Sequence, residues 1–165
     1  MKTITNADWD CKIPIYKISH KILSKKGIKC LLIDVDGTLL SRNTKKIPLK
    51  VKNWVKKSKE LFSIYLVSNN PSRNRIEMIG KELGVSYKFK ALKPSKKVIL
   101  EIIDILKEDN RNIAIIGDRI LTDVIVGNRC KLYTVLVSRL NKKGLPTKLN
   151  MTLIIEKIIS FLFFK

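Results

Sequence analysis

The amino-acid sequence predicts an α/β fold in which a parallel sheet is flanked by helices. Four apolar runs, within residues 29–34, 62–70, 112–118 and 131–138, each end in polar or turn residues, as the buried strands of parallel sheets do. Helical patterns lie between these runs, and such alternation indicates right-handed crossovers between parallel strands. The length of 165 residues suits one domain with a substantial core, so we expect a single domain over residues 1–165.

The elements between the apolar runs follow in a regular order. Residues 48–61 begin with a proline, which suits the first turn of a helix. Residues 71–84 predict the next helix and end on a glycine suited to a C-terminal cap. Residues 87–91 predict a short edge strand, and residues 94–110 carry apolar side chains at the spacing of one helix face. Residues 141–150 predict a loop.

Residues 151–164 predict an amphipathic C-terminal helix. Thr152, Glu156 and Ser160 fall four residues apart on one side of this helix, and most other positions are apolar. Two interpretations stay open: the helix docks on the sheet, or it lies in the interface of a membrane with lysines facing anionic lipid. The second interpretation places three aromatic side chains among the lipid headgroups: Phe161, Phe163 and Phe164.

The charge of the chain indicates its partners. Its 34 Lys and Arg residues against 14 Asp and Glu residues give a formal net charge of +20, which attracts phosphates, nucleic acid and anionic lipid. Lysine dominates this count. Proteins that bind nucleic acid specifically depend more on the planar guanidinium group of arginine than on lysine. A nucleic-acid partner is therefore possible but not favoured.

Cysteine usage and hydropathy indicate the compartment. The three cysteines are widely spaced and form no Cys-x-x-Cys pair, so we expect a reducing compartment. The first residues lack the apolar core of a secretory signal, which favours an intracellular protein. No uninterrupted apolar run approaches the roughly 20 residues that span a bilayer, so any membrane contact is expected to be peripheral. The abundance of Lys and Ile suits a cytoplasmic or an organellar protein of the plastid or mitochondrial type.

Polar side chains follow the predicted strands at the points where ligands bind in parallel sheets, beyond the carboxyl ends of the strands. Four such points carry chemically useful groups: Asp34 and Asp36, then Ser68 with Asn69 and Asn70, then Lys93, and last Asp118 with Asp123. Carboxylates gathered at one point repel one another unless a cation lies among them, and an all-oxygen cluster suits Mg²⁺. The ion and Lys93 would create a positive pocket for a phosphoryl group, to which the Ser68 hydroxyl could donate.

These groups suggest phosphoryl chemistry. Asp34 can attack phosphorus as a nucleophile and form an aspartyl-phosphate. Asp36 can protonate the leaving alkoxide and later deprotonate the hydrolytic water. We assign four further residues to substrate binding as candidates: Asn69, Thr38, Arg75 and Asn128.

The motifs resemble those of a known group of enzymes. The segments "DVDGT", "SNN", "KP" and "GDRILTDV" resemble, in this order, the four motifs of the haloacid dehalogenase superfamily of phosphohydrolases. The longer segments "SNNPSRNRI", "ALKP" and "GDRILTDVIVGNR" resemble the YqeG-type phosphatases of subfamily IIIA. That subfamily includes the phosphatidylglycerophosphate phosphatases of bacterial and organellar membranes. The resemblance covers about residues 13–140 and implies a Rossmann-like core.

The resemblance also implies roles for individual residues. It makes Asp34 the nucleophile and Asp36 the acid/base, whose backbone carbonyl is a further metal ligand. It makes Asp118 a magnesium ligand with Asp123 in support. Ser68 and Lys93 would be the phosphate ligands.

The spacing of the motifs bears on the substrate. Only about thirty residues separate the first motif from the second, and one helix and one strand fill them, so we expect no cap domain. A bulky substrate that itself covers the open site is then favoured, because a small ester would be poorly shielded from water. We expect phosphatidylglycerophosphate, presented at a membrane surface. The alternatives are a nucleic-acid end, a phosphoprotein or a soluble metabolite as substrate, or a non-catalytic basic adaptor.

Overall fold

A six-stranded parallel sheet organises the chain, in a computed structural model that describes residues 3–147 and 150–163. The strand order is β1-β6-β5-β2-β3-β4, and every neighbouring pair is parallel. The predicted fold class is therefore confirmed. The strands are β1 (Trp9–Asp10), β2 (Cys30–Ile33), β3 (Ser63–Val67), β4 (Ser86–Lys88), β5 (Ile113–Gly117) and β6 (Tyr133–Leu136).

Helices connect the strands. The α-helices are α1 (His20–Lys25), α2 (Leu49–Ser58), α3 (Arg73–Leu83), α4 (Lys97–Leu106), α5 (Ile125–Arg129) and α6 (Met151–Phe163). Shorter helical turns are η1 (Ile15–Lys17), η2 (Asn110–Asn112) and the π-helical turn η3 (Ile120–Val124). Residues 34–48, between β2 and α2, hold no helix or strand beyond one isolated bridge, so no cap domain is inserted there.

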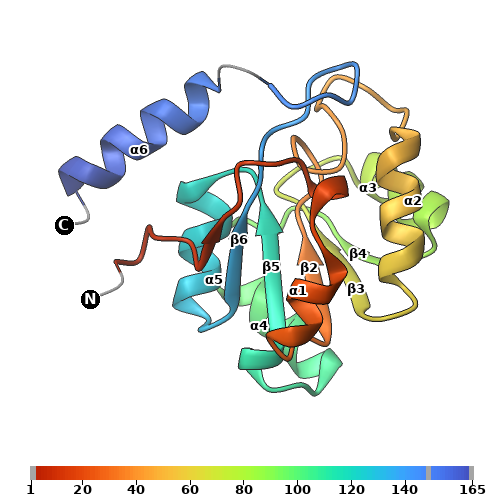
Figure 1. Cartoon of the computed structure of the whole chain (residues 1–165), viewed down its shortest axis with the longest axis horizontal. Coiled ribbons are helices and arrows are strands. Elements are labelled where there is room, and N and C mark those ends of the chain that lie inside the picture. The colour runs from red at the N-terminus through yellow and green to blue at the C-terminus, as the bar shows by residue number, and fades with distance from the viewer. Residues whose placement is uncertain (1–2, 148–149, 164–165) are drawn as a thin grey trace.

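Each face of the sheet is covered by its own helices, which Figure 1 shows in front of and behind the strands. Side chains alternate across a strand. In β2, Leu31 and Ile33 therefore pack in the cluster that contains buried residues of α1, α2 and α3. Cys30 and Leu32 pack with α4 and α5 on the opposite face. Burial on both faces explains why these strands are continuous apolar runs in the sequence.

The order in which the chain adds strands to the sheet reverses between β2 and β5, which are neighbours. From β2 it continues to β3 and β4 on one side, and it then returns to place β5 and β6 on the other. Ile33 of β2 pairs with Ile116 of β5, so the residues that follow these two strands emerge at the same level. Such a switch point is where open α/β sheets bind ligands.

Several elements were absent from the sequence prediction, among them α1, β1 and the π-helical turn η3. Strand β1 is only two residues long and pairs with β6, so it carries no periodic signal of its own. The π-helical turn η3 follows β5 and brings Asp123 to the interior, where the residue is 2% exposed. π-helical turns occur frequently at functional sites.

Helix α6 lies beside the N-terminal segment and away from the two main layers (Figure 1). It docks through its polar side, because Glu156 is buried whereas Ile155, Ile158 and Phe161 are exposed. Leu153 is the apolar residue of α6 that packs against the small cluster around Ile120 and Leu136. The predicted helix over 151–164 is thus present from 151 to 163, and residue 164 lies outside the described residues.

Within residues 3–147 and 150–163, no helix is both long enough and apolar enough to cross a membrane.

We predict that Gly127→Ala destabilises the protein by about 1–2 kcal/mol, because an added Cβ would overlap the side-chain methyl groups of Ile115 and Thr134 on the sheet. The free energy of unfolding in urea measures the effect. Lys97→Ala, at an exposed position of α4, is the control and should change stability by less than about 0.5 kcal/mol. Equal stability of Gly127→Ala and wild type would contradict the close packing of α5 on the sheet.

Candidate active site

Three carboxylates meet at the switch point of the sheet. Asp34 follows β2, Asp118 follows β5, and Asp123 belongs to η3. One oxygen from each lies within 4.8 Å of the others, and all three residues are buried. The backbone N–H of Asp34 donates to the carbonyl of Ile116 at 2.9 Å, which fixes the level at which the first carboxylate leaves the sheet.

Lys93 lies in contact with this cluster and is 4% exposed. Its Nζ donates to Asp34 Oδ1 at 2.8 Å, to Asp123 Oδ1 at 2.6 Å and to the carbonyl of Val67 at 2.7 Å. Burial by itself would lower the pKa of Lys93, but the Asp123 and Asp34 carboxylates outweigh burial and raise its pKa. The lysine is therefore an ammonium ion at neutral pH.

The protein groups alone do not balance the charge of the cluster. Burial raises the pKa of Asp34 to about 6, the Lys93 ammonium opposes this rise, and Asp123 adds to it. The pKa of Asp118 is raised well above its usual range, first by burial and then by the Asp34 and Asp123 carboxylates. Raised carboxyl pKa values at one buried point indicate a site that needs more positive charge than Lys93 supplies.

The donor set fits a divalent metal ion. Asp118 Oδ2 is buried without a hydrogen bond from the described residues, and Arg139 Nη1 lies 3.5 Å from it as an ion-pair partner. Carboxylate oxygens are the ligands that hard divalent cations prefer. Gly37 keeps the space open: its φ of +102° suits glycine, and a Cβ there would lie 2.5 Å from Asp118 Oδ2.

Asp36 lies beside the cluster and has partners of its own. Asn70 Nδ2 donates to its Oδ2 at 2.6 Å, and Arg75 Nη2 donates to its Oδ1 at 2.8 Å. Arg75 also donates to the backbone carbonyls of Thr44 and Ser41. These bonds fix the orientation of the Asp36 carboxylate.

Ser68 and Asn69 lie at the end of β3 and line the same cavity as Asp34. The Ser68 hydroxyl accepts from the backbone N–H of Asn70 at 3.1 Å. The Asn69 side chain forms two hydrogen bonds with the backbone of Lys93. Its Oδ1 accepts from the Lys93 N–H at 2.7 Å, and its Nδ2 donates to the Lys93 carbonyl at 2.8 Å. Asn69 thus fixes the position of the Lys93 backbone, and both polar atoms of its side chain are used in doing so.

Three candidates for substrate binding are placed differently from our expectation. Thr38 is fully buried and donates to Asp118 Oδ1 at 3.4 Å, so it supports a predicted metal ligand. Arg75 donates to the Asp36 carboxylate and to two backbone carbonyls. Its guanidinium therefore orients Asp36 instead of pointing toward a substrate. Asn128 lies near the end of α5 and donates to the carbonyls of Ile4 and Asn6, so it fastens the N-terminal segment.

The cavity of about 120 Å³ over the cluster has further lining residues that we did not predict as site residues. They are Arg42, Arg119, Thr122 and Arg139. Arg119 and Thr122 lie between Asp118 and Asp123, so the motif itself was a signal for them. Arg42 and Arg139 lie outside every motif. Their signal was the residue type, since the chain has only seven arginines among its 34 basic residues.

We predict that Mg²⁺ stabilises the protein more at about pH 7.5 than at about pH 5, because metal binding requires deprotonated carboxyls. The raised pKa of Asp34, about 6, stabilises the metal-free fold at low pH, and this contribution is lost as the pH rises through 6. A hundredfold excess of Mg²⁺ over Kd should add about 2.7 kcal/mol, or roughly 5–10 °C in Tm.

Thermal unfolding with and without Mg²⁺ at the two pH values measures this effect. In Asp118→Asn, which loses one ligand charge, the shift should largely disappear. An Mg²⁺ shift that is equal at both pH values, or one that persists in Asp118→Asn, would contradict a metal site at these carboxylates.

Comparison with known proteins places this geometry in a family. A family model described as mitochondrial PGP phosphatase matches residues 1–140. The probable phosphatase YqeG of Bacillus subtilis is 30% identical over 124 residues, which are 74% of this chain and 72% of the relative.

Solved structures share the fold. An uncharacterized protein from Listeria monocytogenes aligns with a TM-score of 0.56 at 15% identity, over 76% of this chain and 86% of the other. The cobalt-bound deoxy-D-mannose-octulosonate 8-phosphate phosphatase of Haemophilus influenzae aligns with a TM-score of 0.54 at 16% identity, over 68% and 69%. At these identities the likeness concerns the fold alone.

The sequence and the geometry lead to the same conclusion. The four motifs meet at one point, and the family match covers most of the chain. The alternative of a non-catalytic basic adaptor is therefore not supported. The chain belongs to the mitochondrial PGP phosphatase family and is a YqeG-type phosphatase of the haloacid dehalogenase superfamily, an enzyme that hydrolyses phosphoric monoesters.

Proposed function

We propose that this phosphatase depends on Mg²⁺ and removes the terminal phosphate of phosphatidylglycerophosphate at a membrane surface. The observation that carries the proposal is the orientation of α6, which turns an apolar face to solvent near the edge of the sheet that holds the site. The family match, the charge of +20 and the absence of a cap over the site support it. We propose an organellar location on the family description, and one domain over residues 1–165.

The side chains divide the reaction between them. Asp34 attacks phosphorus, so that a bond forms between its carboxylate oxygen and phosphorus while the bond to the leaving oxygen breaks. Asp36 gives its proton to the leaving alkoxide. In the second half, Asp36 takes a proton from water as the water attacks phosphorus, which releases inorganic phosphate and restores Asp34. The Arg75 and Asn70 contacts aim the Asp36 carboxylate in both halves.

Positive charge stabilises the transferred phosphoryl group. Lys93 holds its ammonium against Asp34, where a phosphoryl oxygen would also lie, and the Ser68 hydroxyl lines the same cavity. Asp34, Asp118 and the Asp36 carbonyl would hold Mg²⁺ with support from Asp123. When bound, the ion supplies charge neutralisation for the carboxylates and the phosphate oxygens.

The exposed face of α6 is chemically suited to lipid. Seven large apolar side chains of α6 are 39–75% exposed: Met151, Ile154, Ile155, Ile158, Phe161, Leu162 and Phe163. Of these, Phe161 also lines the cavity beside the N-terminal segment. Glu156, the one acidic residue of α6, is instead 2% exposed and faces the protein. A surface helix normally turns its apolar side to the protein core and its polar side to solvent. The exposed apolar side of α6 therefore favours an apolar partner. The large positive charge favours an anionic bilayer as that partner.

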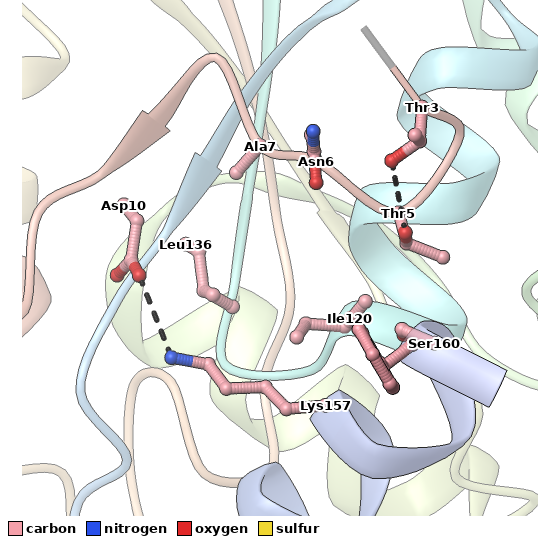
Figure 2. Close-up of a pocket in the computed structure, with 10 residues that line it drawn as sticks. Thr3, Thr5, Asn6, Ala7, Asp10, Ile120, Leu136, Lys157 and Ser160 are labelled. Atoms are coloured by element: carbon pink, nitrogen blue, oxygen red, sulfur yellow. Dashed lines mark hydrogen bonds and ion pairs between the residues drawn. The ribbon is translucent and has the colours of Figure 1, made fainter. Parts of the chain in front are cut away.

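The attachment of α6 leaves most of this face exposed to solvent. A cavity of about 550 Å³ lies between the N-terminal segment and α6. Figure 2 shows Lys157 directed toward Asp10 beside this cavity. The two side chains form an ion pair at 3.8 Å. Glu156 and Lys157 thus hold one side of α6 to the protein and turn the opposite side outward. Each lysine close to an anionic surface adds on the order of 1 kcal/mol, so a few of them would retain the enzyme there.

A lipid substrate would also cover the active site, which has no cap domain. The cavity over the cluster holds only about 120 Å³, enough for a phosphoryl group and little more. The remainder of the substrate therefore lies outside the cavity, where a lipid seated in a bilayer would cover the opening and exclude water.

We expect purified protein with Mg²⁺ to release phosphate from phosphatidylglycerophosphate in phosphatidylglycerol–phosphatidylcholine vesicles. Asp34→Asn should lower the rate by at least roughly a thousandfold, because it removes the nucleophile. Phosphate release measures both rates. Turnover of a soluble ester with none from the vesicles would rule out the lipid substrate, and fastest release from a polynucleotide end would favour that substrate instead.

We predict that Leu162→Ser weakens vesicle binding roughly tenfold or more, because it removes an apolar side chain from the membrane-facing side of α6. Co-sedimentation with anionic vesicles measures binding. Leu61→Ser is the matched control: Leu61 is 57% exposed, close to the 63% of Leu162, but it precedes β3, on the other side of the sheet from β1 and β6. Equal effects of the two substitutions would exclude α6 as the membrane-binding element.

A further inference from the structure

Arginine is concentrated around the active-site cavity. Three of the seven arginines, Arg42, Arg119 and Arg139, line the cavity, although lysines far outnumber arginines in the chain. The planar guanidinium group of arginine matches a phosphate with two parallel hydrogen bonds, which an ammonium group does not do. The transferred phosphoryl group already has Lys93, and it would also have the Mg²⁺ that the acidic cluster would hold. The arginines therefore offer binding capacity for another anionic group.

Among these three arginines, Arg119 is bound by a side chain of α6, Glu156. Its Nε donates to Glu156 Oε1 at 2.8 Å. Glu156 Oε2 accepts from the backbone N–H of Ile120 at 2.7 Å. A carboxylate that is 2% exposed thus binds both the side chain of Arg119 and the backbone that follows it.

This arrangement leaves part of the guanidinium available. Among the contacts of the described residues, the Arg119 side chain uses only Nε, and the side chain remains 42% exposed. Arg119 lines the cavity together with Asp34 and Ser68, so its terminal nitrogens can reach a ligand whose phosphoryl group is at the cluster. A charged group fixed in orientation loses less conformational entropy when it binds than a free side chain does.

We propose that Arg119 is a specificity-determining residue that binds a second phosphate of the substrate, and that Glu156 is the residue that positions it. The proposal rests on the proposed function for the identity of that phosphate, which is the phosphodiester one glycerol unit away from the terminal monoester. Glu156 belongs to α6, so the helix that faces the membrane also orients the group that receives the lipid headgroup. Substrates with a single phosphate do not use this contact.

The test uses two soluble substrates, so that it does not depend on membrane binding. One is the deacylated headgroup, glycerophosphoglycerophosphate, which carries a phosphodiester and a phosphomonoester. The other is glycerol 3-phosphate, which carries only the monoester. We expect the wild type to prefer the first compound in kcat/KM. In Arg119→Gln this preference should fall about tenfold, mainly through a higher KM, as the loss of a charge-assisted hydrogen bond predicts.

Two further variants separate positioning from general damage. Glu156→Gln keeps the shape of the side chain but removes its charge, and it should reduce the same preference severalfold by releasing Arg119. Lys97→Gln, at an exposed position of α4, is the control and should keep the preference within twofold. If Glu156 were only structural, Glu156→Gln would lower kcat for both substrates equally.

The proposal is overturned if the wild type shows no preference for the two-phosphate compound, including the case in which that compound is not hydrolysed. It is also overturned if Arg119→Gln keeps the preference of the wild type. A failure in the vesicle assay alone would instead count against the membrane-surface function, because both soluble substrates lack acyl chains.

Discussion

Three buried carboxylates whose oxygens lie within 4.8 Å of one another impose the main physical constraint on this protein. The buried ammonium of Lys93 offsets part of their repulsion, and the raised pKa values of Asp34 and Asp118 show that it does not offset all of it. Much of the surrounding structure serves this cluster. Gly37 leaves room beside Asp118, Asn69 holds the Lys93 backbone, and η3 carries Asp123 inward.

The sheet explains why such a cluster can be stable. Strands β2 and β5 are buried on both faces, so packing from both sides holds the residues that follow them in place. The same edge of the sheet also receives α6 through the contacts of Glu156 with Arg119 and Ile120. The catalytic loop after β5 is therefore supported from the sheet on one side and from the C-terminal helix on the other.

The distribution of polar and apolar side chains on α6 links the active site to the exposed apolar side of this helix. A buried glutamate is costly unless its charge is paired and its oxygens accept hydrogen bonds. Arg119 and the Ile120 N–H meet both requirements for Glu156, and this fixes which side of α6 faces the protein. The exposed apolar side is thus a consequence of the same contact that orients Arg119. One interaction links the lining of the cavity with the face that we assign to the membrane.

The sequence by itself determined the parallel sheet, the order of its helices and the residues of the acidic cluster. These features are local: continuous apolar runs mark buried strands, and strand ends in a parallel sheet meet at one edge. Only the tertiary structure decided that Arg75 faces Asp36, that Asn128 holds the N-terminal segment, that α6 docks by its polar side and that Arg42 and Arg139 reach the cavity. Those outcomes depend on contacts between residues far apart in the chain, and no spacing along the sequence encodes which partner a charged side chain will find.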